Sequence, residues 1–234
     1  MPRRVLVTGG DRGIGLAIAR RFLAEGDTVA VTYRSSPPPR DVAGIACDVT
    51  DPAAVHDAVA EFESRHGTVE VLVANAGITL DKLLLRMSEE DFLSVVDTNL
   101  AGAFRLARRV ALGMVKGRWG RLVFISSTSA HLGAAGQVNY AASKAGLVGL
   151  ARSLAWELAP RNVTANVVSP GLIATGMSAR VGADRVAALL GATPLGCMGS
   201  PEDVAHVVRF VASEEARYVT GAVIPVAGGL GMGQ

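Results

Sequence analysis

The chain has 234 residues, of which half are apolar and 19% are charged, so it can bury a sizeable core and is neither a disordered protein nor a coiled coil. Its 23 basic and 21 acidic side chains leave a formal charge of +2 with no long basic block, so we expect no nucleic-acid partner. The sequence shows no signal-peptide segment, no apolar run near the roughly 20 residues that span a bilayer, and only two cysteines, which favours a cytoplasmic protein without membrane contact.

Short β-branched runs alternate with helical patterns along the chain. Strands are expected at residues 4–8, 28–33, 44–48, 69–74, 121–126, 163–169 and 222–226. Helices are expected from residue 14 until Gly26, at 53–66, from near Ser88, at 138–159 and from Pro201. About seven alternations predict an α/β fold in one domain, residues 1–234: a doubly wound parallel sheet of about seven strands with helices on both faces (Rossmann-like).

One glycine-rich segment, residues 175–199, has no clear periodicity. Segments of this kind are often lids or substrate loops, and this is our prediction. The alternative is an ordinary surface excursion.

Glycines mark the turn between the first expected strand and the first helix. Glycine lets a backbone approach a pyrophosphate closely, and a helix N-terminus offers free N–H groups and the positive end of its dipole. We therefore predict that a dinucleotide binds here, with contacts from Gly9, Asp11, Arg12, Gly13, Ile14 and Gly15.

The end of the second strand predicts which dinucleotide is bound. An NAD site usually places Asp or Glu there, but this chain has Arg34. Arg34, with help from Arg12, could pair with the 2′-phosphate of NADP, whereas the alternative is a solvated charge. After the third strand, Asp48 and Val49 are expected beside the adenine, unless Asp48 is only a polar strand end. The predicted cofactor is therefore NADPH/NADP+.

Tyr140 and Lys144 lie four residues apart and share one face of an expected helix. A free tyrosine titrates near pH 10, and a neighbouring cation favours its ionised form, which brings it closer to a useful acid or base. Ser127 follows the fifth strand, at the edge of an open α/β sheet where ligands bind. We predict that the three side chains act on a carbonyl substrate.

These residues together make the chain similar to the short-chain dehydrogenase/reductase family over essentially its whole length. The resemblance implies a catalytic tetrad of Asn99, Ser127, Tyr140 and Lys144. It also implies that the cofactor is held by Asn75, Ala76, Gly77, Tyr140, Lys144, Pro170, Gly171, Ile173 and Thr175.

Within that family the chain most resembles 3-oxoacyl-[acyl-carrier-protein] reductases, through residues 139–146, 162–168 and 220–226. The resemblance implies NADPH-dependent reduction of a β-keto acyl thioester, a substrate bound to acyl carrier protein, and a homotetramer. Gly176 and Ala227 depart from residues common in such reductases. They leave a ketoreductase of a polyketide or other specialised pathway as an alternative, and a non-catalytic NADP-binding sensor is a further one.

Two other sets of residues bear on partners. Arg118, Arg121 and Arg161 flank the expected strand and helix of the tetrad and could form a basic rim for an acidic carrier protein, unless they are only solvated charges. The four histidines lack the spacing of metal ligands, so we expect no metal site.

Overall fold

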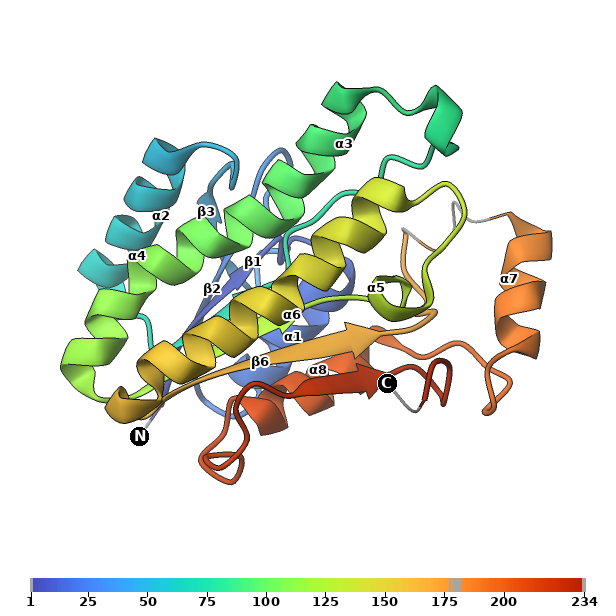
Figure 1. The fold of residues 1–234 in the computed structure, drawn as a ribbon. Coiled ribbons are helices and arrows are strands. Elements are labelled where there is room, and N and C mark those ends of the chain that lie inside the picture. Colours follow the sequence, from blue (N-terminus) through green and yellow to red (C-terminus); the bar gives the residue numbers. More distant parts are fainter. Residues whose placement is uncertain (1, 177, 179–181, 233–234) are drawn as a thin grey trace.

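The computed structural model describes residues 2–176, 178 and 182–232. Seven parallel strands form one sheet in the order β3-β2-β1-β4-β5-β6-β7 (Figure 1). The strands are β1 (Arg4–Thr8), β2 (Thr28–Tyr33), β3 (Ala43–Ala46), β4 (Val71–Ala74), β5 (Gly120–Ile125), β6 (Val163–Pro170) and β7 (Val223–Val226). The predicted doubly wound α/β fold is confirmed, and the strand order reverses direction between β1 and β4.

Helices cover both faces of this sheet. They are α1 (Gly13–Leu23), α2 (Pro52–His66), α3 (Glu89–Val96), α4 (Gly102–Gly117), α5 (Ser129–Leu132), α6 (Val138–Leu158), α7 (Ala183–Gly191) and α8 (Pro201–Val211). Single turns occur at Leu84–Arg86 and Ala159–Arg161, and a π-helical turn at Asp97–Ala101 joins α3 to α4. In Figure 1, α4 and α6 cross the front of the sheet, and α1 and α8 lie behind it.

The strands are apolar because both of their faces are buried. On β1, Leu6 belongs to the core beneath α2, α4 and α6, whereas Val5 and Val7 belong to the core against α1 and α8. All three side chains are fully buried. A parallel sheet between two helical layers requires such continuous apolar runs, which is why the strands could be recognised from the sequence.

Helix ends follow local hydrogen-bonding rules. Ser88 and Ser200 cap α3 and α8, and in each case the aspartate three residues later completes a capping box. Gly102 needs its small size, because a Cβ there would lie 2.8 Å from the Val49 side chain. The two predicted helix starts are thus confirmed, and the π-helical turn inside the long helical stretch is a feature that the sequence analysis did not predict.

The segment 175–199 differs from the expectation of an irregular loop, because its middle forms the nine-residue helix α7. No side chain of α7 is fully buried, but the half-buried residues Arg185, Val186, Leu189 and Leu190 share one face of the helix and the other residues are exposed. Ala and Leu also favour helix formation. Met177 and Val181, two apolar residues of this predicted lid or substrate loop, lie outside the described residues.

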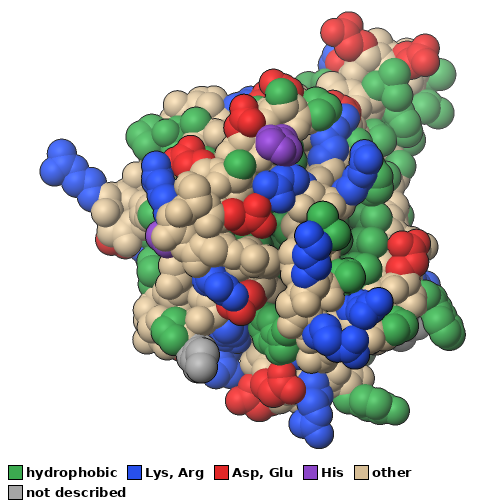
Figure 2. Space-filling view, turned by 90° about the vertical axis from the view of Figure 1, so that its left-hand side faces the viewer, with side chains coloured by type: hydrophobic (Ala, Val, Ile, Leu, Met, Phe, Trp, Pro, Cys, Tyr) green, Lys and Arg blue, Asp and Glu red, His purple; other side chains and the backbone are tan. Residues whose placement is uncertain are grey.

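The surface carries charges of both signs. Figure 2 shows Lys and Arg side chains interspersed with Asp and Glu on the side that lies at the left of Figure 1. Among the described residues, no group of three His, Cys, Asp or Glu side chains could hold a metal ion. Nor does any helix in this part of the chain combine the length and the apolar character that crossing a membrane requires. Cys47 and Cys197 are free thiols.

Arg121 contradicts the prediction of a basic rim, because its side chain is completely buried. Its Nη2 lies 3.0 Å from Oε2 of Glu214, and its Nη1 donates to the carbonyls of Gly120 and Asn162 at 2.9 and 3.2 Å. The guanidinium also stacks on Trp119, 4.4 Å from the ring centroid. Arg121 is therefore a structural residue that joins β5 to the chain after α8.

Arg121→Ala should lower the free energy of unfolding by about 2–4 kcal/mol, because it leaves a cavity and buried carbonyls without a donor. Chemical denaturation measures this change. Arg161→Ala, at an exposed position, should change stability by less than about 0.5 kcal/mol. Equal stabilities for both variants would contradict the structural role of Arg121.

Candidate active site

The predicted site residues gather at the carboxyl ends of the strands, near the point where the strand order reverses. This is the edge at which open α/β sheets bind ligands. β1 leads into the glycine turn, β4 into residues 75–77, and β5 into Ser127. The fold therefore brings together the three segments that the sequence analysis selected separately.

Hydrogen bonds made by the side chains of Thr8 and Asn75 join the glycine turn to the end of β4. Oγ1 of Thr8 accepts hydrogen bonds from the backbone N–H groups of Asn75 and Ala76, both at 3.0 Å. Nδ2 of Asn75 donates to the carbonyls of Thr8 and Gly9 at 3.0 and 2.9 Å. A Cβ at Gly9, whose φ is +60°, would lie 2.9 Å from Cα of Ala76. Asn75 thus acts by fixing the turn, and Gly9 permits the close approach.

A groove of about 620 Å³ opens beside this turn. Eight predicted cofactor residues line it: Gly9, Asp11, Arg12, Arg34, Asp48, Val49, Ala76 and Gly77. The prediction did not include seven others: Thr32, Tyr33, Ser35, Ser36, Cys47, Ile78 and Thr98. Most of these are immediate neighbours of predicted residues at strand ends, so the position of the strand ends was the signal that could have found them.

The groove has the chemistry that a dinucleotide needs. No side chain caps the N-terminus of α1, so its first N–H groups remain available to a phosphate. Arg12 and Arg34 are exposed at the groove. Hydrogen bonds from the backbone and hydroxyl of Thr50 hold the pKa of Asp48 below its ordinary value, and the nearby charge of Arg34 acts in the same direction. The residues present therefore fit an anionic dinucleotide.

Asn99 lies in the π-helical turn and is buried. Its Oδ1 accepts from the backbone N–H of Ile78 at 2.8 Å, and its Nδ2 donates to the Ile78 carbonyl at 3.1 Å and to Oγ of Ser143 at 3.0 Å. Asn99 thereby ties the segment after β4 to α6. Ser143 was not predicted, although its place between Tyr140 and Lys144 was a signal.

Lys144 is 4% exposed, and its Nζ donates to the carbonyl of Ile125 at 2.8 Å. Burial lowers the pKa of Lys144 to about 8. Gly77 lies directly above this ammonium group, since a Cβ at Gly77 would be 3.4 Å from Nζ and 3.1 Å from Oδ1 of Asn99. The absence of a side chain at Gly77 therefore gives access to Lys144 from the groove.

Tyr140, in the first turn of α6, is hydrogen-bonded to Ser127, which follows β5. Burial raises the pKa of Tyr140, a hydrogen bond with Ser127 acts in the opposite direction, and the charge of Asp81 raises it further. The expected lowering by Lys144 is not seen in the protein alone, because the ammonium points to Ile125 and lies 5.7 Å from the centroid of the Tyr140 ring. Asn139, fully buried, accepts from the Tyr140 N–H at 2.7 Å and was not predicted.

Four more predicted cofactor residues, Pro170, Gly171, Ile173 and Thr175, lie at the end of β6 or after it, and they do not line the groove. Gly13, Ile14 and Gly15 form the first turn of α1. A Cβ at Gly13 would be 3.7 Å from Cγ2 of Thr175, so the segment after β6 does meet the glycine turn. The carbonyl of Pro170 accepts the N–H of Thr128 at 2.9 Å. Gly171 allows a close approach to Ala227, and the Ile173 side chain packs in the core. Any contact of Ile173 with a cofactor would therefore be made by its backbone.

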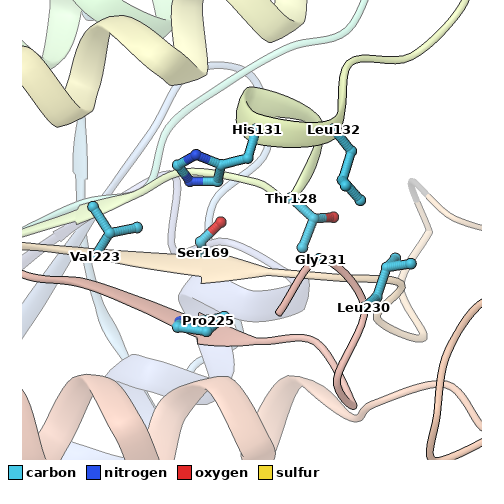
Figure 3. A pocket seen from close by; sticks show the side chains of 8 residues that line it. All are labelled: Thr128, His131, Leu132, Ser169, Val223, Pro225, Leu230 and Gly231. Carbon is cyan, nitrogen blue, oxygen red and sulfur yellow. The ribbon is translucent and has the colours of Figure 1, made fainter. Parts of the chain in front are cut away.

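A second pocket of about 300 Å³ lies beside Thr128, between α5, β7 and the residues that follow β7 (Figure 3). Its polar lining includes His131 and Ser169, and its apolar lining includes Leu132 and Leu230. The hydroxyl of Ser169 is buried and has no hydrogen-bond partner among the described residues. Buried polar groups are normally satisfied, so this hydroxyl is available to a small polar partner in the pocket.

Known proteins are similar in sequence to almost the whole of this chain. A family model described as "Enoyl-(Acyl carrier protein) reductase" matches residues 9–231. The chain is 52% identical to the 3-oxoacyl-[acyl-carrier-protein] reductase MabA of Mycobacterium tuberculosis over 231 residues, which are 99% of this chain and 94% of that protein. The chain belongs to the short-chain dehydrogenase/reductase family.

A second relative extends the similarity beyond mycobacteria. The 3-oxoacyl-[acyl-carrier-protein] reductase FabG of Escherichia coli is 42% identical over 235 residues, covering 97% of this chain and 96% of FabG. Short-chain dehydrogenases/reductases are oxidoreductases that use a nicotinamide cofactor, and the groove beside α1 fits such a dinucleotide.

Proposed function

We propose that this protein is a cytoplasmic NADPH-dependent 3-oxoacyl-[acyl-carrier-protein] reductase of fatty acid biosynthesis, which converts a β-keto acyl thioester into the β-hydroxy acyl thioester. The carrying observation is that Ser127, Tyr140 and Lys144 meet at the carboxyl end of β5, beside a groove that fits a dinucleotide. The names of MabA and FabG support the choice of substrate class.

In this proposal each side chain has a separate task. Ser127 donates a hydrogen bond to the keto oxygen and orients it toward Tyr140. Tyr140 donates its phenolic proton to that oxygen. When bound, the nicotinamide supplies the hydride for the keto carbon. Lys144, whose ammonium is reached past Gly77, binds the nicotinamide ribose and favours the phenolate that remains on Tyr140.

The bonds of Asn99 give it mainly a positioning role. Both hydrogens of its Nδ2 are used, by the Ile78 carbonyl and by Ser143. Its Oδ1 retains a second lone pair, since one accepts from Ile78. A water held there would let Asn99 contribute to replacing the proton that Tyr140 gives up, as the family resemblance implies.

We still propose that the substrate is bound to acyl carrier protein. The carrier protein cannot, however, dock on the basic rim that the sequence analysis predicted. Arg118 lies two residues before β5 and Arg161 two residues before β6, whereas Ser127 follows β5. The two arginines therefore lie at the opposite edge of the sheet from the tetrad of the same subunit. They cannot form a rim around that subunit's own site.

Three other functions are alternatives to this one. The family description names an enoyl reductase, which would act on a carbon–carbon double bond. Gly176 and Ala227 depart from residues common in 3-oxoacyl reductases and so leave a specialised ketoreductase as an alternative. A sensor without turnover is disfavoured by the complete tetrad. Acetoacetyl thioesters on carrier protein and on a small thiol, a crotonyl thioester and cyclic ketones separate these readings when NADPH oxidation is followed.

We also propose a homo-oligomer, a tetramer by resemblance to the family, in which α4 and α6 pack against another copy. These helices lie together at the front of Figure 1, and the front of Figure 1 is the right-hand edge of Figure 2, where hydrophobic side chains gather. Phe104 and Leu112 on α4 are 46% and 61% exposed, and Trp156 on α6 is 87% exposed. Apolar side chains this exposed on neighbouring helices fit an interface.

Tyr140→Phe should reduce turnover of acetoacetyl thioesters by about 10²–10⁴-fold, because the phenol is the proposed acid, while NADPH binding persists. Steady-state oxidation of NADPH and a binding titration measure the two effects. Near wild-type reduction by this variant would overturn the catalytic assignment. Faster turnover of the crotonyl thioester than of the keto thioester in the wild type would overturn the substrate assignment.

Arg34→Ala should weaken NADPH binding by about 10- to 100-fold and change NADH binding little, because a charge-assisted hydrogen bond to the 2′-phosphate would be lost. Binding titrations of both cofactors measure this selectivity. Arg40→Ala, in the same exposed connection, is the matched control. Equal weakening of both cofactors would show that Arg34 does not read the phosphate.

Trp156→Glu should lower the mass of the protein in solution, because a charge at the proposed interface cannot be buried without a partner. Sedimentation equilibrium measures the mass. Leu85→Glu, at a position that is 98% exposed in the turn before α3, should leave the mass unchanged. A wild-type monomer, or an unaltered oligomer in the Trp156 variant, would contradict the α4–α6 interface.

A further inference from the structure

Asp81, in the loop between β4 and α3, meets side chains from two other parts of the site. Its Oδ2 accepts a hydrogen bond from Nε2 of Gln137 at 2.9 Å and lies 3.8 Å from Nη1 of Arg185. Gln137 immediately precedes α6, and Arg185 lies in the first turn of α7. Asp81 thus connects α7 to the start of the helix that carries Tyr140.

Hydrogen bonds extend this connection to the catalytic serine. Oε1 of Gln137 accepts from Oγ of Ser129 at 3.4 Å, and the backbone N–H of Ser129 donates to Oγ of Ser127 at 3.2 Å. The loop is also held by its backbone, since the N–H of Lys82 donates to the carbonyl of Gly136 at 2.9 Å. The position of Asp81 is therefore linked to the position of Ser127.

The helix α7 is only lightly held to the rest of the molecule. None of its side chains is fully buried. Within the described part of the chain, the contact between Arg185 and Asp81 is the one ion pair that α7 makes. In Figure 1, α7 stands apart from the helices of the two layers, at the same edge of the sheet as α5 and the start of α6. A helix held in this way can change position at small cost.

We propose that Asp81 is a positioning residue of the reductase: its contact with Arg185 holds α7 closed against the loop before α3, and the positive charge of Arg185 then offsets part of the negative charge that Asp81 presents to Tyr140. Closure of α7 is thereby coupled to the acidity of the proton donor. This inference rests on the proposed function, because it takes Tyr140 as that donor.

The electrostatic part of the proposal has a definite sign. The charge of Asp81 raises the pKa of Tyr140, so it favours the protonated phenol. Arg185 offsets this charge when the pair is formed, which makes the phenol a stronger acid with α7 closed than with α7 open. The elements around the ring also carry Lys144 on α6, Lys82 with its partner Asp91 at 2.6 Å, and His131 on α5.

The test uses Asp81→Asn and Arg185→Gln. The apparent pKa of Tyr140 should fall by about 0.5 unit in Asp81→Asn and rise by a similar amount in Arg185→Gln, since coupling at exposed ion pairs is of this order. It is read from the alkaline limb of kcat/KM for reduction, and independently by ultraviolet titration of tyrosinate without cofactor. The titration uses variants that also carry Tyr33→Phe and Tyr218→Phe, because the chain has three tyrosines.

A second measurement separates the effect of the Asp81–Arg185 contact on α7 from its effect on the charge near Tyr140. Both single variants break the same pair, so amide hydrogen exchange in α7 should accelerate in both, whereas the pKa of Tyr140 moves in opposite directions. The double variant should match Asp81→Asn in both measurements. A loss of protein stability alone would not produce this pattern.

Asp41→Asn and Arg20→Gln are the matched controls, because they break a similarly exposed pair, with Nε of Arg20 2.9 Å from Oδ2 of Asp41, on another part of the surface. Both should leave the pKa of Tyr140 and the exchange of α7 unchanged. Shifts of equal sign in the two test variants, or no shift in either, would overturn the inference while Tyr140→Phe still reports on the proposed function separately.

Discussion

Burial of the Lys144 ammonium is the constraint on which the arrangement of the site depends. With only the Ile125 carbonyl as its hydrogen-bond partner among the described residues, the charge is poorly solvated, and its pKa falls to about 8. The fall from the usual 10.5 corresponds to about 3 kcal/mol of lost stability at neutral pH. Because the folded pKa lies below the unfolded one, this penalty is complete below about pH 8 and disappears as the pH rises toward the unfolded value.

The surrounding residues follow from that constraint. Gly77 has no side chain that could cover the ammonium, and Asn99 holds the backbone after Gly77 in place through Ile78. Ser126 anchors the other side by donating to the backbone carbonyl of Lys144 itself at 2.8 Å. A bound anion or ribose hydroxyl would give this buried charge a further partner and so offset part of its desolvation penalty.

Much of this could be predicted from the sequence because the constraints are local. Both faces of the sheet are buried, so β1 and β2 were predicted with their observed bounds. The four-residue spacing of Tyr140 and Lys144 needs only a helix to become a shared face. The glycine turn needs only a strand before it and a helix after it, and the fold supplies both.

The errors arose where distant contacts decide the outcome. Arg121 was predicted to be exposed, but it is buried and pairs with the carboxylate of Glu214, 93 residues away. No local sequence pattern predicts a partner at such a distance along the chain. Helix α7 was missed because it buries no complete face. The rim of Arg118 and Arg161 was a different error: the direction of a parallel strand already places residues before β5 and β6 at the edge opposite Ser127.

The pKa values of Tyr140 and Lys144 also bear on the direction of the reaction. Burial and Asp81 raise the pKa of Tyr140, so the resting enzyme carries the neutral phenol at physiological pH. A neutral phenol is the form that can donate a proton to a keto oxygen, whereas the reverse oxidation needs the phenolate as a base. In the proposed mechanism Tyr140 already holds its proton, but the phenolate left after donation has no cation beside it, because the Lys144 ammonium donates to the Ile125 carbonyl. A cofactor that approaches Lys144 past Gly77 and a carbonyl that bonds to Ser127 would stabilise that phenolate together, which would couple proton donation to full occupancy of the site.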